Sequence, residues 1–149
     1  MIGNGAFMTD QTMAGRVCVI TGAASGMGRI AARELAKMGA TIVMNDREVA
    51  DGHEARADII NLSGNDRVEF IECDMGEFGQ VRRFAAHISK KYPAVHVLIN
   101  NAGLTDPEYR LNSTGHEQHM AIMHLGHYLL IHLLLDRLRA GAPARIIQI

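Results

Sequence analysis

Short apolar runs rich in β-branched residues alternate with longer amphipathic stretches along most of this chain. The short runs, which predict strands, are 17–21, 41–45, 67–73, 95–100 and 145–149. The longer stretches carry apolar residues at helical spacing and predict helices over 29–38, 48–62, 77–91 and 115–139. Thr114 and Glu117 have the spacing of a capping box at the start of the last helix, and Gly141 and Pro143 end it.

The apolar runs are continuous rather than alternating, which is typical of strands buried on both faces. Such strands, separated by helices, predict a parallel sheet with helices on both faces and right-handed crossovers. We expect one α/β domain over residues 15–149, after a loose leader over residues 1–14 that shows no periodicity. The fifth strand ends flush with the chain, so we also expect the domain to be truncated after this strand.

The composition favours a globular protein and excludes some classes of partner. Apolar residues make up 48% of the 149 and the formal net charge is −1, so no basic surface is available for nucleic acid. No apolar run approaches the roughly 20 residues of a membrane-spanning helix, and we find no secretory signal. Cys18 and Cys73 are expected to be buried free thiols, which makes a cytoplasmic location our expectation.

Candidate chemistry begins where the first strand ends, in Thr21-Gly22-Ala23-Ala24-Ser25-Gly26-Met27-Gly28. A glycine-rich turn between a strand and a helix can bind phosphate, because backbone N–H groups point outward and the helix dipole adds about half a positive charge. Gly22 allows the tight turn, Gly26 lets a pyrophosphate approach the backbone, and Gly28 lets the helix pack closely. An ordinary strand-to-helix turn is the alternative, and the flanking elements favour the phosphate site.

An acidic residue follows the second strand at the distance that this motif requires. Asp46 lies 18 residues beyond Gly28, close to the roughly 20-residue offset of a carboxylate that binds an adenosine ribose. A surface aspartate at the start of the next helix is the alternative interpretation. The glycine-rich turn before it favours the ribose-binding role.

Several motifs in order resemble the short-chain dehydrogenase/reductase family, in particular its retinol-dehydrogenase-like branch. The family's TGxxxGxG motif matches 21–28, its Asn-Asn-Ala-Gly motif matches 100–103, and its acidic residue after the third strand matches Asp74. Residues 124–138 resemble its long central helix and the last residues its fifth strand, so the resemblance covers 15–149. It implies a doubly wound Rossmann fold with strand order 3-2-1-4-5.

The resemblance also implies a dinucleotide site, with the adenine beside Asp74 and the nicotinamide ribose beside the 100–103 turn. The residues expected to bind the cofactor are Gly22, Ser25, Gly26, Met27, Gly28, Asp46, Arg47, Asp74, Met75, Asn100, Asn101, Ala102 and Gly103. We expect NAD in preference to NADP, because the Asp46 carboxylate would accept hydrogen bonds from both ribose hydroxyls and repel a 2′-phosphate. Arg47 argues for NADP, but Ser25 stands where relatives preferring NADP tend to carry a second basic residue.

The family's chemistry uses a serine after the fifth strand and a Tyr-x-x-x-Lys pair on the following helix, and this chain has neither. Tyr92, Tyr109 and Tyr128 all lack a lysine four residues later, and Met123 replaces an asparagine that supports a proton-relay water in the family. Two functions stay open. One is the cofactor-binding part of an oxidoreductase that transfers a hydride between a nicotinamide and an alcohol or carbonyl. The other is a non-catalytic nucleotide-binding or partner-binding subunit.

The 115–139 helix and the last strand suggest further interactions. Histidines at 116, 119, 124 and 127 form two pairs at three-residue spacing, which permits a metal site, but no cysteine or acidic residue completes either pair at ligand spacing. Buried or interface histidines are the favoured interpretation. The apolar face of the helix and the unpaired edge of the 145–149 strand predict self-association.

Overall fold

Parallel strands form one sheet in the computed structural model, which describes residues 12–149. The strands are β1 (Val17–Thr21), β2 (Thr41–Asp46), β3 (Val68–Glu72), β4 (Val97–Asn100) and β5 (Arg145–Gln148). Their order across the sheet is β3-β2-β1-β4-β5, and every neighbouring pair is parallel, so the predicted order is confirmed. The order reverses between β1 and β4, which places a crevice at the carboxyl ends of these strands.

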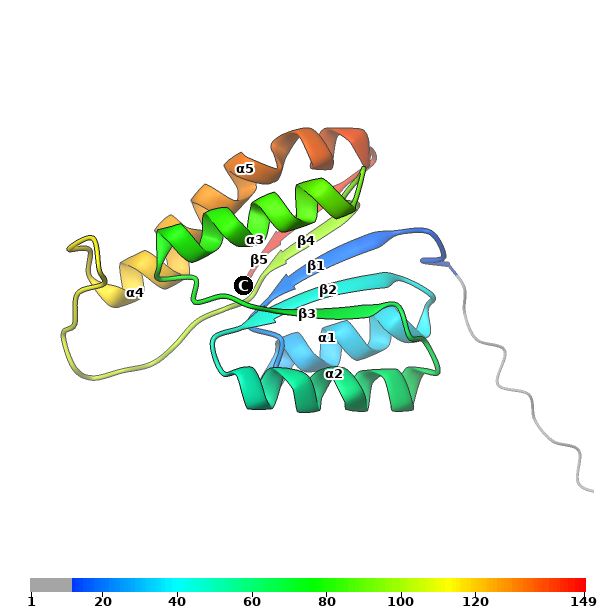
Figure 1. Ribbon diagram of the computed structural model, residues 1–149, viewed down its shortest axis with the longest axis horizontal. Coiled ribbons are helices and arrows are strands. Elements are labelled where there is room, and N and C mark those ends of the chain that lie inside the picture. The colour runs from blue at the N-terminus through cyan, green and yellow to red at the C-terminus, as the bar shows by residue number, and fades with distance from the viewer. Residues whose placement is uncertain (1–11) are drawn as a thin grey trace, which may run out of the picture.

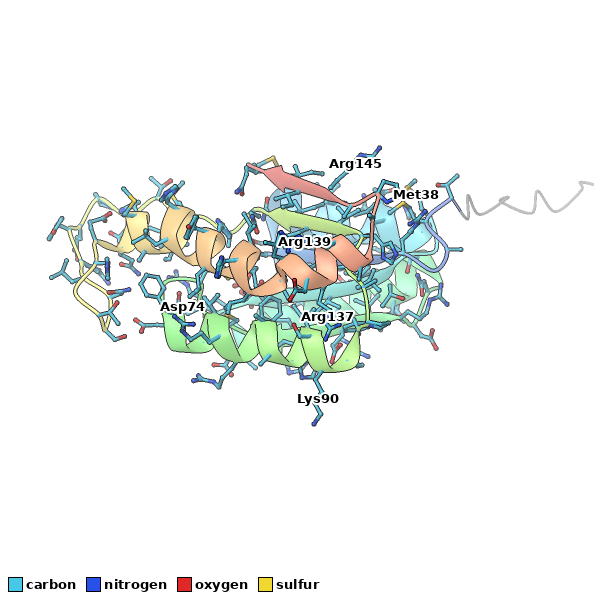
Figure 2. The ribbon with its side chains drawn as sticks, turned by 90° about the horizontal axis from the view of Figure 1, so that it is seen from above. Met38, Asp74, Lys90, Arg137, Arg139 and Arg145 are labelled. Atoms are coloured by element: carbon cyan, nitrogen blue, oxygen red, sulfur yellow. The ribbon has the colours of Figure 1, made fainter. Side chains whose placement is uncertain are left out.

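Helices cover the two faces of the sheet (Figure 1). The pair α1 (Gly26–Lys37) and α2 (Val49–Ser63) lies on one face, and α3 (Phe78–Lys91) and α5 (His127–Ala140) lie together on the other (Figures 1 and 2). Alternate strand residues supply the two cores: Ile20 and Ile42 pack in the cluster of the first pair, and Val19 and Val43 in that of the second. The continuous apolar runs therefore have the physical cause that the sequence predicts.

Burial on both faces holds only for the inner part of the sheet. The strands β1, β2 and β4 are almost wholly buried, whereas β3 is partly exposed and every residue of β5 is exposed. The burial on both faces that its apolar run suggests does not hold for β5, whereas the unpaired edge predicted for this strand does, because β4 is its only neighbour in the described sheet. Ile146 and Ile147 are 43% and 41% exposed as a result.

The helix predicted over 115–139 starts later and contains a wider turn. A short helix α4 (Gln118–Met120) leads through a π-helix η1 (Ala121–Gly126) into α5. The predicted capping box is wrong: Glu117 itself caps the helix and accepts hydrogen bonds from the backbone of His119 and Met120. The Thr114 hydroxyl instead hydrogen-bonds the side chains of Asn112 and His116, at 3.0 Å each. Within residues 12–149, no helix is long and apolar enough to cross a membrane.

Residues 12–14, which the sequence analysis assigned to the leader, contact the domain through Met13. Residues 1–11 of the expected leader lie outside the described residues. Thr12–Gly15 form a turn in which the Met13 backbone donates a hydrogen bond to Met38 at 2.9 Å, and Met13 packs against the core beneath α1. The last residues assigned to the leader are thus attached to the domain.

The cysteines are free and buried, as predicted. Burial raises the pKa of both thiols to about 12, so Cys18 and Cys73 are neutral at physiological pH. Cys18 lies in β1, and Cys73 directly follows β3, with β2 between them. Neither thiol has the thiolate character of a reactive cysteine.

Candidate functional site

A cleft of about 320 Å³ opens at the carboxyl ends of the strands, where the loops after β1, β2, β3 and β4 meet. Every residue that the sequence analysis assigned to the cofactor lines it except Gly28 and Asn100, which are buried. The cleft is also lined by Asn45, Glu48, Cys73, Leu104 and Ile122. Four of these adjoin predicted residues in the sequence, whereas Ile122 is brought in by η1 and had no sequence signal.

The glycine-rich turn presents its backbone to the cleft. Gly22 has a φ of +62°, and a Cβ there would lie 2.7 Å from the Cα of Ala102, so the turn and its close approach both require glycine. Gly26 has a φ of +53°, and a Cβ there would meet nothing within 4 Å. The first glycine is therefore needed for packing, whereas the second leaves open space at the cleft surface, at the start of α1.

Gly28 holds α1 close to the loop that carries the Asn-Asn-Ala-Gly motif. A Cβ at Gly28 would lie 2.5 Å from the Gly22 carbonyl oxygen and 2.6 Å from Nδ2 of Asn101. That amide nitrogen donates hydrogen bonds to the carbonyl oxygens of Thr21 and Gly22, at 3.0 Å each. Gly28 therefore supports the site by allowing close packing of α1. It is not itself in the cleft lining, although the sequence analysis assigned it to the cofactor-binding residues.

Asp46 joins the end of β2 to both the glycine-rich turn and α2. Its Oδ2 accepts a hydrogen bond from the backbone N–H of Ala24 at 3.2 Å. Its Oδ1 accepts from the N–H groups of Arg47 at 2.8 Å and Glu48 at 3.3 Å. The carboxylate is therefore fixed at the cleft by the backbone of both elements, where the sequence placed it.

Asp74 and Met75 line the cleft in the loop after β3. Oδ1 of Asp74 accepts from the backbone of Gly76 at 2.8 Å, and the Asp74 N–H donates to the side chain of Gln80 at 3.0 Å. Figure 2 shows Asp74 beside the first turn of α3. Met75 is 3% exposed. A flat ring in this part of the cleft would meet an acidic acceptor and an apolar wall.

A buried hydrogen-bond network connects the site to α5, and sequence reasoning missed it. Thr21 Oγ1 accepts from the backbone N–H groups of Asn101 and Ala102, at 2.9 Å each, and lies 2.9 Å from Nε2 of His127. With both acceptor positions taken, the Thr21 hydroxyl donates to Nε2 of His127. The other ring nitrogen, Nδ1, then carries the proton and donates to the Met123 carbonyl oxygen at 3.3 Å.

Burial lowers the pKa of His127, whose side chain is 3% exposed, and therefore favours the neutral imidazole that this network requires. Thr21 is the first residue of the glycine motif, and His127 lies in the 124–138 stretch that resembles the family's long central helix. Their separation of 106 positions concealed the contact. The network fixes the turn after β4 against the end of β1.

The three tyrosines lie outside the cleft lining, and so does Met123, which replaces the family's relay asparagine. Tyr92 donates a 2.6 Å hydrogen bond to Glu69 at the β3 edge, and burial together with this bond raises its pKa. Tyr109 and Tyr128 are exposed. Met123 is 50% exposed, and its side chain lies about 3.7 Å from where a Cβ of Gly103 would stand. None of these groups is placed as an acid or base at the cleft.

Three histidines of the 116–132 region each have a separate hydrogen-bond partner. His116 contacts Thr114, His119 contacts Glu117, and His127 contacts Thr21. No group of three histidine, cysteine or acidic side chains in residues 12–149 is arranged to hold a metal ion.

Comparison with known proteins places these features in context. The family model described as short chain dehydrogenase matches residues 16–149. Retinol dehydrogenase 12 from Bos taurus is 40% identical over 145 residues, which cover 97% of this chain and 46% of that protein. The chain thus spans about half the length of the curated relatives it matches.

Two solved structures share the fold and were determined with a nicotinamide cofactor. A metagenomic short-chain oxidoreductase in complex with NADP has a TM-score of 0.80 at 26% identity, covering 91% of this chain and 62% of that chain. L-Sorbose reductase from Gluconobacter frateurii, complexed with NADPH and L-sorbose, has a TM-score of 0.79 at 27% identity, covering 93% and 53%.

Proposed function

The chain belongs to the short-chain dehydrogenase family, and we propose that it forms the dinucleotide-binding part of an NAD(P)-dependent oxidoreductase acting on an alcohol or carbonyl compound. The observation that carries this proposal is the joining of Asp46 to the glycine-rich turn. One carboxylate oxygen holds the Ala24 N–H while the same side chain lines the cleft beside Gly26. A ribose acceptor and a phosphate-binding backbone are thereby fixed side by side.

The residues at the cleft fit a dinucleotide. The space beside Gly26 is open, so a pyrophosphate could approach the backbone there. Any other residue at this position would place its side chain in that space. The first turn of α1 carries no acidic residue that would compete with an anion, and the Ser25 side chain makes no capping bond to the helix. Free N–H groups and the helix dipole both favour a phosphate at this position.

In this proposal, residues 15–149 bind the dinucleotide and orient it. A bound nicotinamide cofactor supplies the hydride-transfer chemistry. Asp46 would hold the ribose hydroxyls, Asp74 and Met75 would contact the adenine, and the Asn101–Gly103 turn would form the floor beside the nicotinamide ribose. The Thr21–His127 network keeps that floor in position. In the family, the serine and the Tyr-x-x-x-Lys pair follow the fifth strand, and residues 1–149 carry neither.

We propose NAD as the preferred dinucleotide. Asp46 puts a negative charge at the ribose end of the cleft, and a 2′-phosphate would be repelled by it. The two solved structures described above hold NADP and NADPH, which belong to those proteins. The comparison therefore supports a nicotinamide dinucleotide, and the choice between the two rests on the charges around this cleft.

Titration calorimetry of the full chain with NAD and with NADP tests the proposal. We expect weak but saturable binding of NAD and a higher Kd for NADP. Asp46→Ala should raise the Kd for NAD about tenfold, or about 1.4 kcal/mol, because hydrogen bonds to a charged acceptor are lost. Asp136→Ala on α5 is the matched control, since its side chain is 92% exposed and lies outside the cleft lining.

Asp46→Asn separates ribose binding from support of the loop. The asparagine side chain keeps one acceptor oxygen for the backbone N–H groups but loses the charge. We expect the Asp46→Asn chain to bind NAD less tightly than the unmodified chain. The difference between its Kd values for NAD and NADP should also be smaller. Absence of binding by the unmodified chain, or equal affinities in the unmodified and Asp46→Ala chains, would overturn the proposal.

A further inference from the structure

Three consecutive charged residues line the ribose end of the cleft: Asp46, Arg47 and Glu48. Arg47 Nε lies 3.3 Å from Oε1 of Glu48. Glu48 is the N-cap residue of α2, yet its side chain makes no capping hydrogen bond to that helix. Its carboxylate is therefore directed to Arg47 rather than to the helix backbone.

This ion pair changes what Arg47 offers to a ligand. A guanidinium binds a phosphate best when its planar fork of N–H groups is free to make two parallel hydrogen bonds. Here the Nε–H side of the fork faces a carboxylate. A 2′-phosphate, which carries about two negative charges at neutral pH, would have to displace Glu48 while lying near two carboxylates.

The net charge of this part of the cleft also disfavours a 2′-phosphate. Asp46, Arg47 and Glu48 together carry one net negative charge at the cleft. Without Glu48 the sum would be zero, and Arg47 would lack its partner. The Arg47 and Glu48 side chains are 47% and 64% exposed, so the pair contributes little to stability and can be separated without unfolding α2.

We propose that Glu48 is a specificity-determining residue that disfavours NADP by occupying Arg47. This inference rests on the proposed function, because it assumes that the cleft holds a nicotinamide dinucleotide. The preference for NAD over NADP would then depend on two carboxylates that act in different ways. Asp46 accepts from the ribose, and Glu48 keeps the adjacent cation from the 2′-phosphate.

Calorimetric Kd values for NAD and NADP, measured on the unmodified chain and on Glu48→Gln, test the inference. We expect Glu48→Gln to lower the Kd for NADP about fivefold, the upper range for an exposed charge pair, while the Kd for NAD changes less than about twofold. Glu54→Gln is the matched control, because Glu54 lies on α2 outside the cleft lining and its side chain is 72% exposed.

The double variant Arg47→Gln/Glu48→Gln distinguishes release of Arg47 from simple loss of negative charge. If Glu48 acts through Arg47, the double variant loses the gain in NADP affinity. Adenosine 2′,5′-bisphosphate and adenosine 5′-monophosphate, titrated as probes, should reproduce the same pattern without the nicotinamide half.

The outcomes separate the inference from the proposed function. Failure of the unmodified chain to bind either dinucleotide would overturn both. Binding of both dinucleotides with an unchanged affinity ratio in Glu48→Gln would overturn the inference and leave the proposed function intact. A gain in NADP affinity that persists in the double variant would also overturn it, since Arg47 would then have no part in the effect.

Discussion

Replacing Gly26 by alanine tests directly where the pyrophosphate lies, because Gly64 offers a matched control. Gly26 and Gly64 have φ values of +53° and +68°, and an added Cβ meets nothing within 4 Å at either position. Both are exposed, and each lies at one end of a helix, α1 or α2. They differ in that Gly26 lines the cleft and Gly64 does not.

The two substitutions should cost similar stability. A non-glycine residue in the left-handed region costs about 1–2 kcal/mol, and a smaller unfolded-state entropy offsets about 0.4–1 kcal/mol of this. We expect Gly26→Ala and Gly64→Ala each to lower the free energy of unfolding by about 1 kcal/mol. For a chain of this size that corresponds to a Tm about 3 °C lower.

The two variants should differ in their response to cofactor. At an NAD concentration one hundred times its Kd, binding stabilises the unmodified chain and Gly64→Ala by about 2.7 kcal/mol. A methyl group at Gly26 that blocks the pyrophosphate should raise the Kd at least tenfold, which leaves about 1.4 kcal/mol at the same concentration. The cofactor-induced rise in Tm should therefore fall from about 8 °C to about 4 °C.

Thermal unfolding monitored by circular dichroism, with and without NAD, measures both effects in one experiment. A full cofactor-induced Tm shift in Gly26→Ala would refute the placement of the pyrophosphate at this turn. Equal loss of the shift in Gly64→Ala would show that the effect is global destabilisation rather than obstruction of the cleft.

Three further predictions concern packing, pH and association. Gly28→Ala should lower the free energy of unfolding by about 2–3 kcal/mol in urea titrations, because the new methyl group overlaps Asn101; a loss no larger than that of Gly26→Ala would contradict this packing role. Burial lowers the pKa of His127 below its ordinary 6.5, so the unfolded chain binds the proton more readily and stability should fall as the pH drops below about 6.5, by up to about 1.4 kcal/mol per pH unit. His127→Gln should flatten that dependence, and an unchanged pH profile of unfolding would refute the assignment. Ile147→Lys on the exposed β5 edge should reduce self-association in sedimentation velocity at tens of micromolar, and a monomeric unmodified chain would contradict the expectation.

The sequence was most informative where one local rule determines a structure. Helix α2 ends at Ser63, one residue after the predicted end at 62, because Gly64 in the left-handed conformation closes the helix. The glycine-rich turn and Asp46 were recognised from spacing, since a strand, a turn and a helix place these groups by covalent connection alone. The inner strands were recognised because burial on both faces excludes polar residues.

Tertiary structure decided the features that depend on distant partners. The apolar run of β5 resembles that of β4, and its exposure follows from its place at the edge of the sheet, which the family resemblance predicts and the pattern of the run alone does not. The π-helix differs from an α-helix by a fraction of a residue per turn, which a periodic pattern cannot resolve over six residues. The contact between Thr21 and His127, which lie 106 positions apart, follows from packing across the fold. Local spacing fixed the backbone of the candidate site, and long-range packing fixed which side chains support it.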